Sequence, residues 1–182
     1  KTPPDIARSL KKVAQAGYRA VQVSGMGPMD PNEMRKIADG EGLRICATHV
    51  TFEELRDTTD ASIEKHNILG CPHVAIGGMP QDYRKDGAEG ISRFARDAHE
   101  VGRKLVAAGK TFSYHNHDWE FALYGDRLAL DIIYQESAPR FVMAELDVHW
   151  VARGGGSPVA WIRKLAGRQV LLHLKDFAVV DR

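Results

Sequence analysis

The sequence of 182 residues lacks any apolar run of about 18 residues, the length that a membrane-spanning helix needs. Its first residues, KTPPDIARSL, also lack the apolar centre of a signal peptide. No sign of charge dominates, because 25 Lys and Arg against 24 Asp and Glu leave a formal net charge of +1. Proteins that bind nucleic acid or anionic membranes normally carry a basic excess. We therefore expect neither partner.

Cysteine and nucleotide-binding motifs are scarce as well. The two cysteines, Cys46 and Cys71, form no disulfide framework and no CxxC metal motif, which favours a reducing compartment. We expect a cytoplasmic protein, with a signal peptide left open because the N-terminus looks truncated. No GxGxxG or GxxxxGK[ST] follows a predicted strand, which excludes the usual dinucleotide and P-loop sites. The apolar fraction of 43% is typical of a globular chain.

Two hydrophobic periods alternate along the chain. Helical stretches carry apolar residues three and four positions apart, as in Ile91, Phe94, Ala98, Val101 and Leu105. Between them lie short runs rich in β-formers, several of them apolar on both faces, as parallel strands covered by helices must be. The pattern predicts six helices and six strands, with the strands at 20–25, 45–50, 73–78, 111–117, 141–150 and 170–177.

Strict alternation of helix and strand predicts an α/β fold with a parallel sheet, either doubly wound or a (β/α)8 TIM barrel. Without a phosphate-cradling motif, the barrel is the better interpretation. A complete barrel has eight strand–helix units and about 250 residues. This chain begins on a helix and stops just past a strand. We expect one incomplete barrel domain over 1–182, with the first strand and the last βα unit missing.

Polar residues gather where the predicted strands end, which is the edge that carries the active site of a TIM barrel. Strand alternation selects their direction, because successive side chains point to opposite faces. In the run 141–150, Asp147 and His149 share the inward face, and in the run 170–177, His173 and Lys175 do so. We therefore expect these four side chains to point into the barrel mouth.

Three potential ligands recur at the interval of one βα unit. Glu120, Asp147 and His173 are 27 and 26 residues apart, so they are expected at neighbouring strand ends facing the same axis. Two carboxylates and an imidazole suit one divalent ion, such as Mn²⁺, Mg²⁺, Co²⁺ or Zn²⁺. Each residue alone is better explained by an ion pair with Lys or Arg. Three residues in phase favour the metal.

Four segments together resemble the sugar phosphate isomerase/epimerase family, in the xylose isomerase-like TIM-barrel superfamily. That superfamily also holds inosose dehydratases, C-glycoside deglycosidases and endonuclease IV. The resemblance covers essentially the whole chain and rests on motifs that are specific only in combination. They are GYRAVQVSG (17–25), YHNHDWEF (114–121), ELDVHW (145–150) and HLKDF (173–177).

The resemblance implies a single divalent ion held by Glu, Asp, His and a second Glu, each from a different strand end. Matched by motif, Glu120, Asp147 and His173 are three of these ligands. The fourth, a Glu on the last strand, has no counterpart in a sequence that ends at Arg182. Some members place the ligand of the fifth strand where His115 stands here, so His115 is the alternative to Glu120.

The chemistry implied by the resemblance is removal of a proton next to a carbonyl, with the resulting enediolate stabilised by the metal. His117, three residues before Glu120, resembles the base, and the ordinary pKa of an imidazole suits that role. The alternative for His117 is to orient Glu120. If His117 is not the base, the resemblance assigns that role to a metal-bound Glu, as in other epimerases, which is Glu120 or the missing second Glu. Lys175 is expected to neutralise the oxyanion or, as readily, to form an ion pair in the mouth. The residues expected to contact the sugar are Gln22, His49, His115 and His149.

The sequence thus predicts a metal-dependent isomerase or epimerase acting on a keto-sugar or sugar derivative. One alternative is a lyase or dehydratase that uses the same enolisation. An endonuclease IV-like enzyme is disfavoured by the net charge of +1. A non-catalytic sugar-binding barrel also stays open, because the fourth ligand is missing. The expected partner is a small sugar substrate, and the sequence leaves a homo-oligomer open.

Overall fold

The computed structural model describes residues 2–176 and 178. Six parallel strands form one sheet in the order β1-β2-β3-β4-β7-β8, so each new strand joins the same growing edge. Their bounds are β1 Ala20–Val23, β2 Arg44–Val50, β3 His73–Ile76, β4 Thr111–His115, β7 Met143–Asp147 and β8 Gln169–His173. No helix in this part of the chain is long and apolar enough to cross a membrane.

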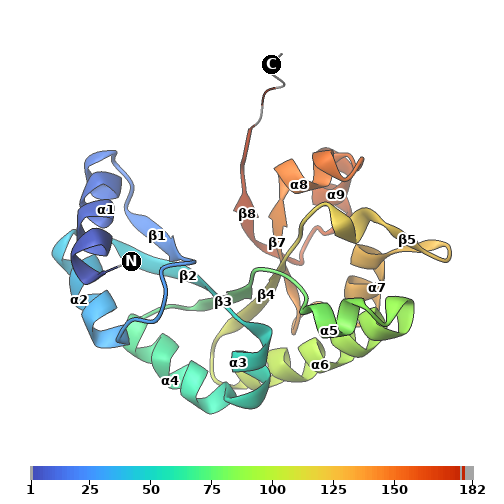
Figure 1. Ribbon diagram of the computed structural model, residues 1–182, viewed down its shortest axis with the longest axis horizontal. Coiled ribbons are helices and arrows are strands. Elements are labelled where there is room, and N and C mark those ends of the chain that lie inside the picture. Colours follow the sequence, from blue (N-terminus) through green and yellow to red (C-terminus); the bar gives the residue numbers. More distant parts are fainter. Residues whose placement is uncertain (1, 177, 179–182) are drawn as a thin grey trace.

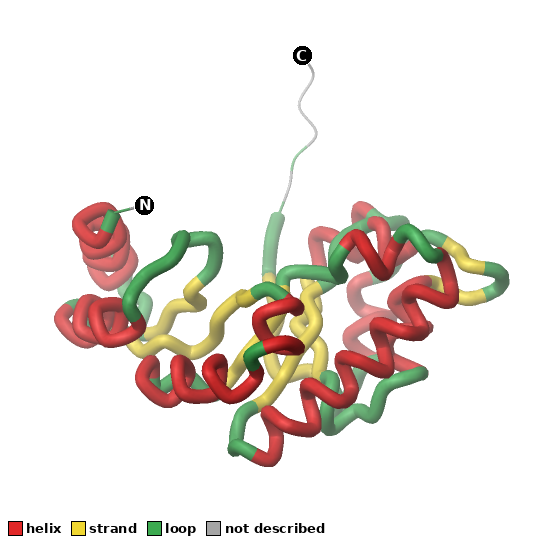
Figure 2. The backbone as a smooth tube through the Cα atoms, turned by 60° about the horizontal axis from the view of Figure 1, so that its bottom comes forward, coloured by secondary structure: helices red, strands yellow, loops and turns green. Residues whose placement is uncertain are grey.

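Helices connect successive strands and lie along the outer side of the curled sheet (Figures 1 and 2). Two helices fill each of three connections, after β2, β3 and β7, and a two-stranded hairpin follows β4. The helices are α1 Pro3–Gln15, α2 Pro31–Gly40, α3 Phe52–Asp57, α4 Thr59–Leu69, α5 Gln81–Arg84, α6 Gly87–Ala107, α7 Ala129–Gln135, α8 Val148–Arg153 and α9 Pro158–Lys164. The hairpin is β5 Leu123–Tyr124 with β6 Arg127–Leu128, preceded by the 3-10 turn η1 Trp119–Phe121.

The predicted barrel-type sheet is confirmed, since six parallel strands in chain order curl with helices on one side. The prediction of six helices is wrong, because the described residues form nine, three connections holding two each. The predicted strand 141–150 is also too long. It ends at Asp147, whose carboxylate caps α8 and so starts a helix at Val148.

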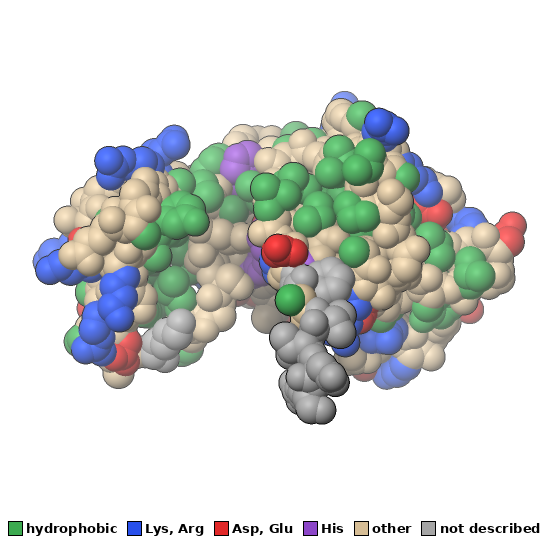
Figure 3. All heavy atoms as spheres, turned by 90° about the horizontal axis from the view of Figure 1, so that it is seen from above, with side chains coloured by type: hydrophobic (Ala, Val, Ile, Leu, Met, Phe, Trp, Pro, Cys, Tyr) green, Lys and Arg blue, Asp and Glu red, His purple; other side chains and the backbone are tan. Residues whose placement is uncertain are grey.

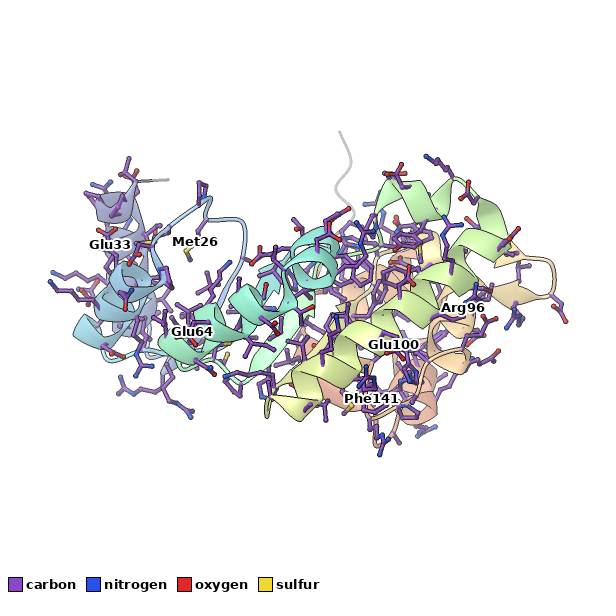
Figure 4. The ribbon with its side chains drawn as sticks, turned by 90° about the horizontal axis from the view of Figure 1, so that it is seen from below. Met26, Glu33, Glu64, Arg96, Glu100 and Phe141 are labelled. Atoms are coloured by element: carbon purple, nitrogen blue, oxygen red, sulfur yellow. The ribbon has the colours of Figure 1, made fainter. Side chains whose placement is uncertain are left out.

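Alternation along the strands packs one face against the helices. Phe112 and Tyr114 of β4, with Ala144 and Leu146 of β7, belong to a large apolar cluster with the inner face of α6. That helix buries apolar residues at helical spacing and exposes Arg96 and Glu100 on its outer side (Figure 4). A second cluster, separate from the first, joins α1 and α2 to β1 and β2 and includes Ile6 and Leu10.

A buried arginine fixes the start of β8 beside β7. The Arg168 guanidinium donates to the carbonyl oxygen of Val142 at 2.8 Å and to that of Ser137 at 3.0 Å, and it also reaches the carbonyl of Tyr134. Since a buried charge is costly unless it is hydrogen-bonded, these carbonyls make its burial tolerable. The contacts hold in register the two strands that carry Asp147 and His173.

The close approach of α6 to the start of β7 requires glycine at position 102. A Cβ atom on Gly102 would lie 1.9 Å from the carbonyl oxygen of Phe141, which is backbone and cannot rotate away. Figure 4 labels Phe141 at this end of α6. Only a shift of the helix or of the strand would relieve the overlap.

We expect Gly102→Ala to lower the free energy of unfolding by about 2 kcal/mol, because overpacking typically costs about 1–3 kcal/mol. Gly40→Ala is the matched control, since a Cβ there meets nothing within 4 Å at the end of α2. It should be neutral or stabilising by up to about 1 kcal/mol. Urea unfolding followed by circular dichroism measures both, and equal effects would contradict this packing.

Candidate active site

The inward face of β7 carries two carboxylates. Glu145 and Asp147 both have 0% exposed surface, while Ala144 and Leu146, which alternate with them along the strand, face the helices. The strand therefore turns its acidic side to the interior of the curled sheet, as alternation predicts. A buried carboxylate needs hydrogen-bond donors or cations around it.

Donors from three strands surround Glu145. Gln22 of β1 donates to Oε1 at 2.6 Å, and His49 of β2 donates to Oε2 at 2.5 Å. His173 of β8 lies 3.2 Å from Oε1 through Nε2, which also lies 2.7 Å from Oε1 of Gln22. Gln22 and His173 stand on the first and last strands of the sheet order. The curl thus brings both edges of the sheet to one carboxylate.

These contacts set the charge of the group. Burial opposes ionisation of Glu145, yet hydrogen bonds from His173 and His49 lower its pKa to about 2. The same contact with Glu145 raises the pKa of His173. The cluster therefore holds a carboxylate at neutral pH and favours the protonated form of His173 beside it.

The two carboxylate oxygens of Asp147 have different partners. Oδ1 accepts the backbone N–H groups of His149 at 3.1 Å and Trp150 at 3.3 Å, which caps α8. Oδ2 faces the interior, 2.6 Å from Nζ of Lys175. Burial opposes ionisation of Asp147, but hydrogen bonds from Lys175 and His115 hold its pKa below the ordinary value. The helix cap thus fixes the direction of Oδ2, the oxygen that faces the site.

Two imidazoles reach the same oxygen of Asp147. His115 Nε2 of β4 lies 3.1 Å from Oδ2, and His173 Nδ1 lies 3.5 Å from it. Burial lowers the pKa of His115 to about 4, despite its contact with Asp147, so this imidazole is neutral at pH 7. Asn116 ties the two strands together, since the backbone N–H of Asp147 donates to its Oδ1 at 2.9 Å.

Two groups of side chains have the composition and spacing of a metal site, with ligand atoms within 4.8 Å of one another. One is His115, Asp147 and His173, and the other is His49, Glu145 and His173. The space-filling view from above shows histidine side chains in the hollow between the two halves of the molecule (Figure 3). Carboxylate oxygen and neutral imidazole nitrogen suit Mn²⁺, Co²⁺ or Zn²⁺.

The structure brings Asp147 and His173 together as the spacing predicts, but it places Glu120 elsewhere. The Glu120 carboxylate is fully buried on the helix side of β4, where Tyr114 donates to Oε1 at 2.7 Å and the backbone N–H of His117 donates to Oε2 at 2.8 Å. Among the described residues it belongs to neither group of potential ligands. The turn η1 folds it away from the barrel axis, and His115 lies where the ligand from this strand was expected.

Burial raises the pKa of Glu120 to about 7, against the opposing hydrogen bond from Tyr114. Phe121, the next residue, holds the turn by packing on Trp161 with ring centroids 5.4 Å apart. It also lies against Gly154, where a Cβ would meet its ring at 2.6 Å. The turn is thus fixed by packing on the outer side of the sheet.

His117 lies at the rim of the inward cluster. Its ring stands 4.9 Å from that of His115 and 5.2 Å from that of Trp150, measured between centroids. Burial lowers its pKa, and the nearby charge of Lys175 adds to that effect. Since its backbone N–H is held by Glu120, the position of this imidazole depends on the buried turn.

For Lys175 and His149, the structure agrees only in part with the positions that the sequence predicts. Lys175 forms the ion pair with Asp147 that was the alternative to a role at the oxyanion, and its ammonium lies 5.0 Å from the Trp150 ring centroid. His149 is placed by α8 rather than by strand alternation, which is a correction, and its ring packs on Trp150 at 4.8 Å.

Sequence reasoning missed the roles of Glu145, Asn116 and Tyr114. Glu145 was recognisable, because it stands two residues before Asp147 and therefore shares its inward face. Asn116 and Tyr114 gave no such signal. Their contacts depend on how β7 and η1 lie against the end of β4.

Comparisons with known proteins confirm the fold that the motifs implied. The chain is 24% identical to a sugar phosphate isomerase/epimerase from Parabacteroides distasonis ATCC 8503, with a TM-score of 0.84 over 96% of this chain and 74% of that one. The D-psicose 3-epimerase from Clostridium cellulolyticum H10, solved with D-tagatose, gives a TM-score of 0.67 at 13% identity over 93% of this chain and 67% of that one. No family model matches the sequence.

A curated relative is also similar in sequence. An inosose dehydratase from Geobacillus kaustophilus (strain HTA426) is 23% identical in an alignment 195 positions long, gaps included, that covers 92% of this chain. The chain spans 60% of the length of that relative. In fold, the six-stranded curled sheet thus matches part of a TIM barrel of the xylose isomerase-like type.

The raised pKa of Glu120 predicts how stability depends on pH in metal-free buffer. Between pH 4.5 and about 7 the carboxyl of the unfolded chain loses its proton while the buried one keeps it, so the contribution of Glu120 to stability falls as pH rises. The fall should be on the order of 3 kcal/mol and level off above pH 7.

Glu120→Gln should remove most of this fall, because an amide cannot ionise and Tyr114 is able to accept from it. Chemical unfolding at pH 5 and pH 8 measures the difference. Glu100→Gln, at an exposed position on α6, is the control and should leave the fall intact. A pH dependence that Glu120→Gln leaves unchanged would contradict the burial of an ionisable carboxyl here.

Proposed function

We propose that this protein is a metal-dependent sugar isomerase or epimerase that removes a proton next to the carbonyl of a keto-sugar or sugar derivative. One observation carries the proposal: inward side chains of β1, β2, β4, β7 and β8 converge on two buried carboxylates. A concave wall of strands with acids, imidazoles and an ammonium group suits binding of a polar substrate and transfer of its protons. The likeness to isomerase and epimerase structures supports the same chemistry.

The residues that would hold the divalent ion are His115, Asp147 and His173. Their donor set fits, because one ionised carboxylate and a neutral imidazole already lie together and the third group can lose its proton to a metal. This assignment replaces Glu120 by His115, the alternative that the motif left open. A divalent ion at this place supplies a Lewis acid that stabilises negative charge on a carbonyl oxygen.

The protein's own residues would perform the remaining tasks. His117 would take the carbon-bound proton, since its ring lies beside His115 at the rim and its backbone is held by Glu120. Lys175, 44% exposed and paired with Asp147, would meet the substrate's developing negative charge. Gln22, His49 and, from the start of α8, His149 would bind hydroxyl groups.

A dehydratase or lyase reaction is the second candidate. It begins with the same proton abstraction and differs only in the loss of a hydroxyl group afterwards. The similarity to an inosose dehydratase over 92% of this chain favours it. In either reaction the side chain that takes the proton is the same.

Solvent deuterium exchange at the carbon next to the carbonyl tests the proposal, measured by NMR or mass spectrometry over a panel of keto-sugars with Mn²⁺. We expect exchange with wild-type protein, lost when the metal is removed by a chelator. His117→Ala should lower the rate by about 10²–10⁴, the usual contribution of a general base. Metal content should stay the same, because His117 is not a ligand in this assignment.

His99→Ala is the matched control, since this histidine lies on α6 against Phe141, on the outer side of the sheet. It should exchange at the wild-type rate. Near-normal exchange in His117→Ala with the metal retained would refute its role as base. Absence of exchange over the whole panel in metal-loaded wild-type protein would refute the proposed function.

A further inference from the structure

A large cavity opens beside the His49 side of the cluster. It has a volume of about 920 Å³ and lies under the loop that joins β1 to α2, with walls from the ends of β2 and β3 and from α4. Ligand pockets in proteins usually measure about 300–1,000 Å³. None of the reaction steps above uses this space.

Most of the lining is apolar, with Glu53, Glu54 and Lys65 among its polar members, and it contains four of the chain's five methionines. Met26, Met29, Met34 and Met79 line the cavity, whereas Met143 lies on β7. Figure 4 shows Met26 on the loop between β1 and α2. Methionine side chains are flexible and polarisable, and their sulfur atoms make favourable contacts with aromatic rings. A wall built in this way adapts to an apolar guest.

The cavity lies between the two apolar clusters of the fold. Met34 and Leu69 on its wall belong to the cluster around α1 and α2, while Phe52 and Met79 belong to the cluster around α6. Protein interiors are normally packed without voids much larger than a water molecule. The space also opens to solvent, and its size lies in the range of ligand pockets, which suits a binding site.

One wall joins the cavity to the proposed reaction site. His49 lines it, accepts from or donates to Ser24 Oγ through Nδ1 at 3.1 Å, and donates through Nε2 to Glu145. Gly77 lies against the same ring, since a Cβ there would be 3.6 Å from Nδ1. A molecule whose apolar end fills the cavity would present its polar end to His49.

We propose that the substrate is a sugar derivative bearing an aryl group, with the sugar at the carboxylate cluster and the aryl group in the methionine-lined cavity. This inference rests on the proposed function and specifies its substrate class. A bare monosaccharide has no apolar part to fill the space. The thioether groups favour an aromatic ring over an alkyl chain.

Binding is tested without turnover, using protein labelled with [¹³C-methyl]methionine in metal-free buffer. Phenyl β-D-glucoside should shift the methyl resonances of Met26, Met29, Met34 and Met79, and leave that of Met143 unchanged. Its dissociation constant should be at least tenfold lower than that of glucose. Equal affinity for glucose, or no methyl shift at saturating concentration, would overturn the inference. Tighter binding of hexyl β-D-glucoside than of the phenyl compound would overturn the choice of an aryl group.

Two variants place the guest in the cavity. Met29→Trp fills the space from a half-buried position and should weaken binding of phenyl β-D-glucoside at least tenfold. Met26→Glu, which puts a charge in the apolar wall, should do the same and serves if the first variant does not fold. Val159→Trp, at an exposed position on α9, is the control and should bind normally. Normal binding in a folded cavity variant would contradict the inference.

The two hypotheses fail separately. Deuterium exchange in bare keto-sugars without methyl shifts from phenyl β-D-glucoside would contradict the substrate class alone. Methyl shifts without exchange in any keto-sugar would contradict the proposed function and leave an aryl glycoside binding site.

Discussion

The polar interior of this sheet depends on the hydrogen bonds to the buried carboxylate of Glu145. Its oxygens receive donors from the first strand, the second strand and the last strand of the sheet order. An ionised carboxylate without such partners would be strongly destabilising, so the sheet must curl until Gln22 and His173 reach it. Backbone pairing holds β4, β7 and β8 side by side, which places Asp147 between His115 and His173. The polar interior of the sheet and its curved shape therefore depend on each other.

Side chains alternate between the two faces of a strand, and this alternation explains which site residues could be placed from the sequence and which could not. It placed Asp147, His173 and Lys175 on the inward face because each lies within a strand or directly after one. It misplaced His149, because the Asp147 carboxylate starts a helix one residue later. It could not place Glu120, since a 3-10 turn after β4 has no period and packing of Phe121 decides its direction. The cavity could not be predicted from the sequence either, because it lies between two separate apolar clusters.

The helix-covered side and the inward side of the sheet have different roles, and β4 contributes residues to both. On the outer side, Tyr114 and Glu120 fix the turn that holds the backbone of His117. On the inner side, His115 faces Asp147. A rigid, packed outer layer thus positions an imidazole at the rim, while the inner layer supplies the charged groups. Pre-organisation of this kind keeps reacting groups within reach of a bound substrate.

In the proposed site, His115, Asp147 and His173 together hold the divalent ion. The most direct test is an anomalous difference map from crystals of the protein grown or soaked with Mn²⁺. We expect one peak within about 2.0–2.3 Å of the Asp147 carboxylate and of both imidazoles. A peak bound to Glu120 would contradict the ligand assignment, and no peak in this cluster at saturating Mn²⁺ would contradict the metal site itself.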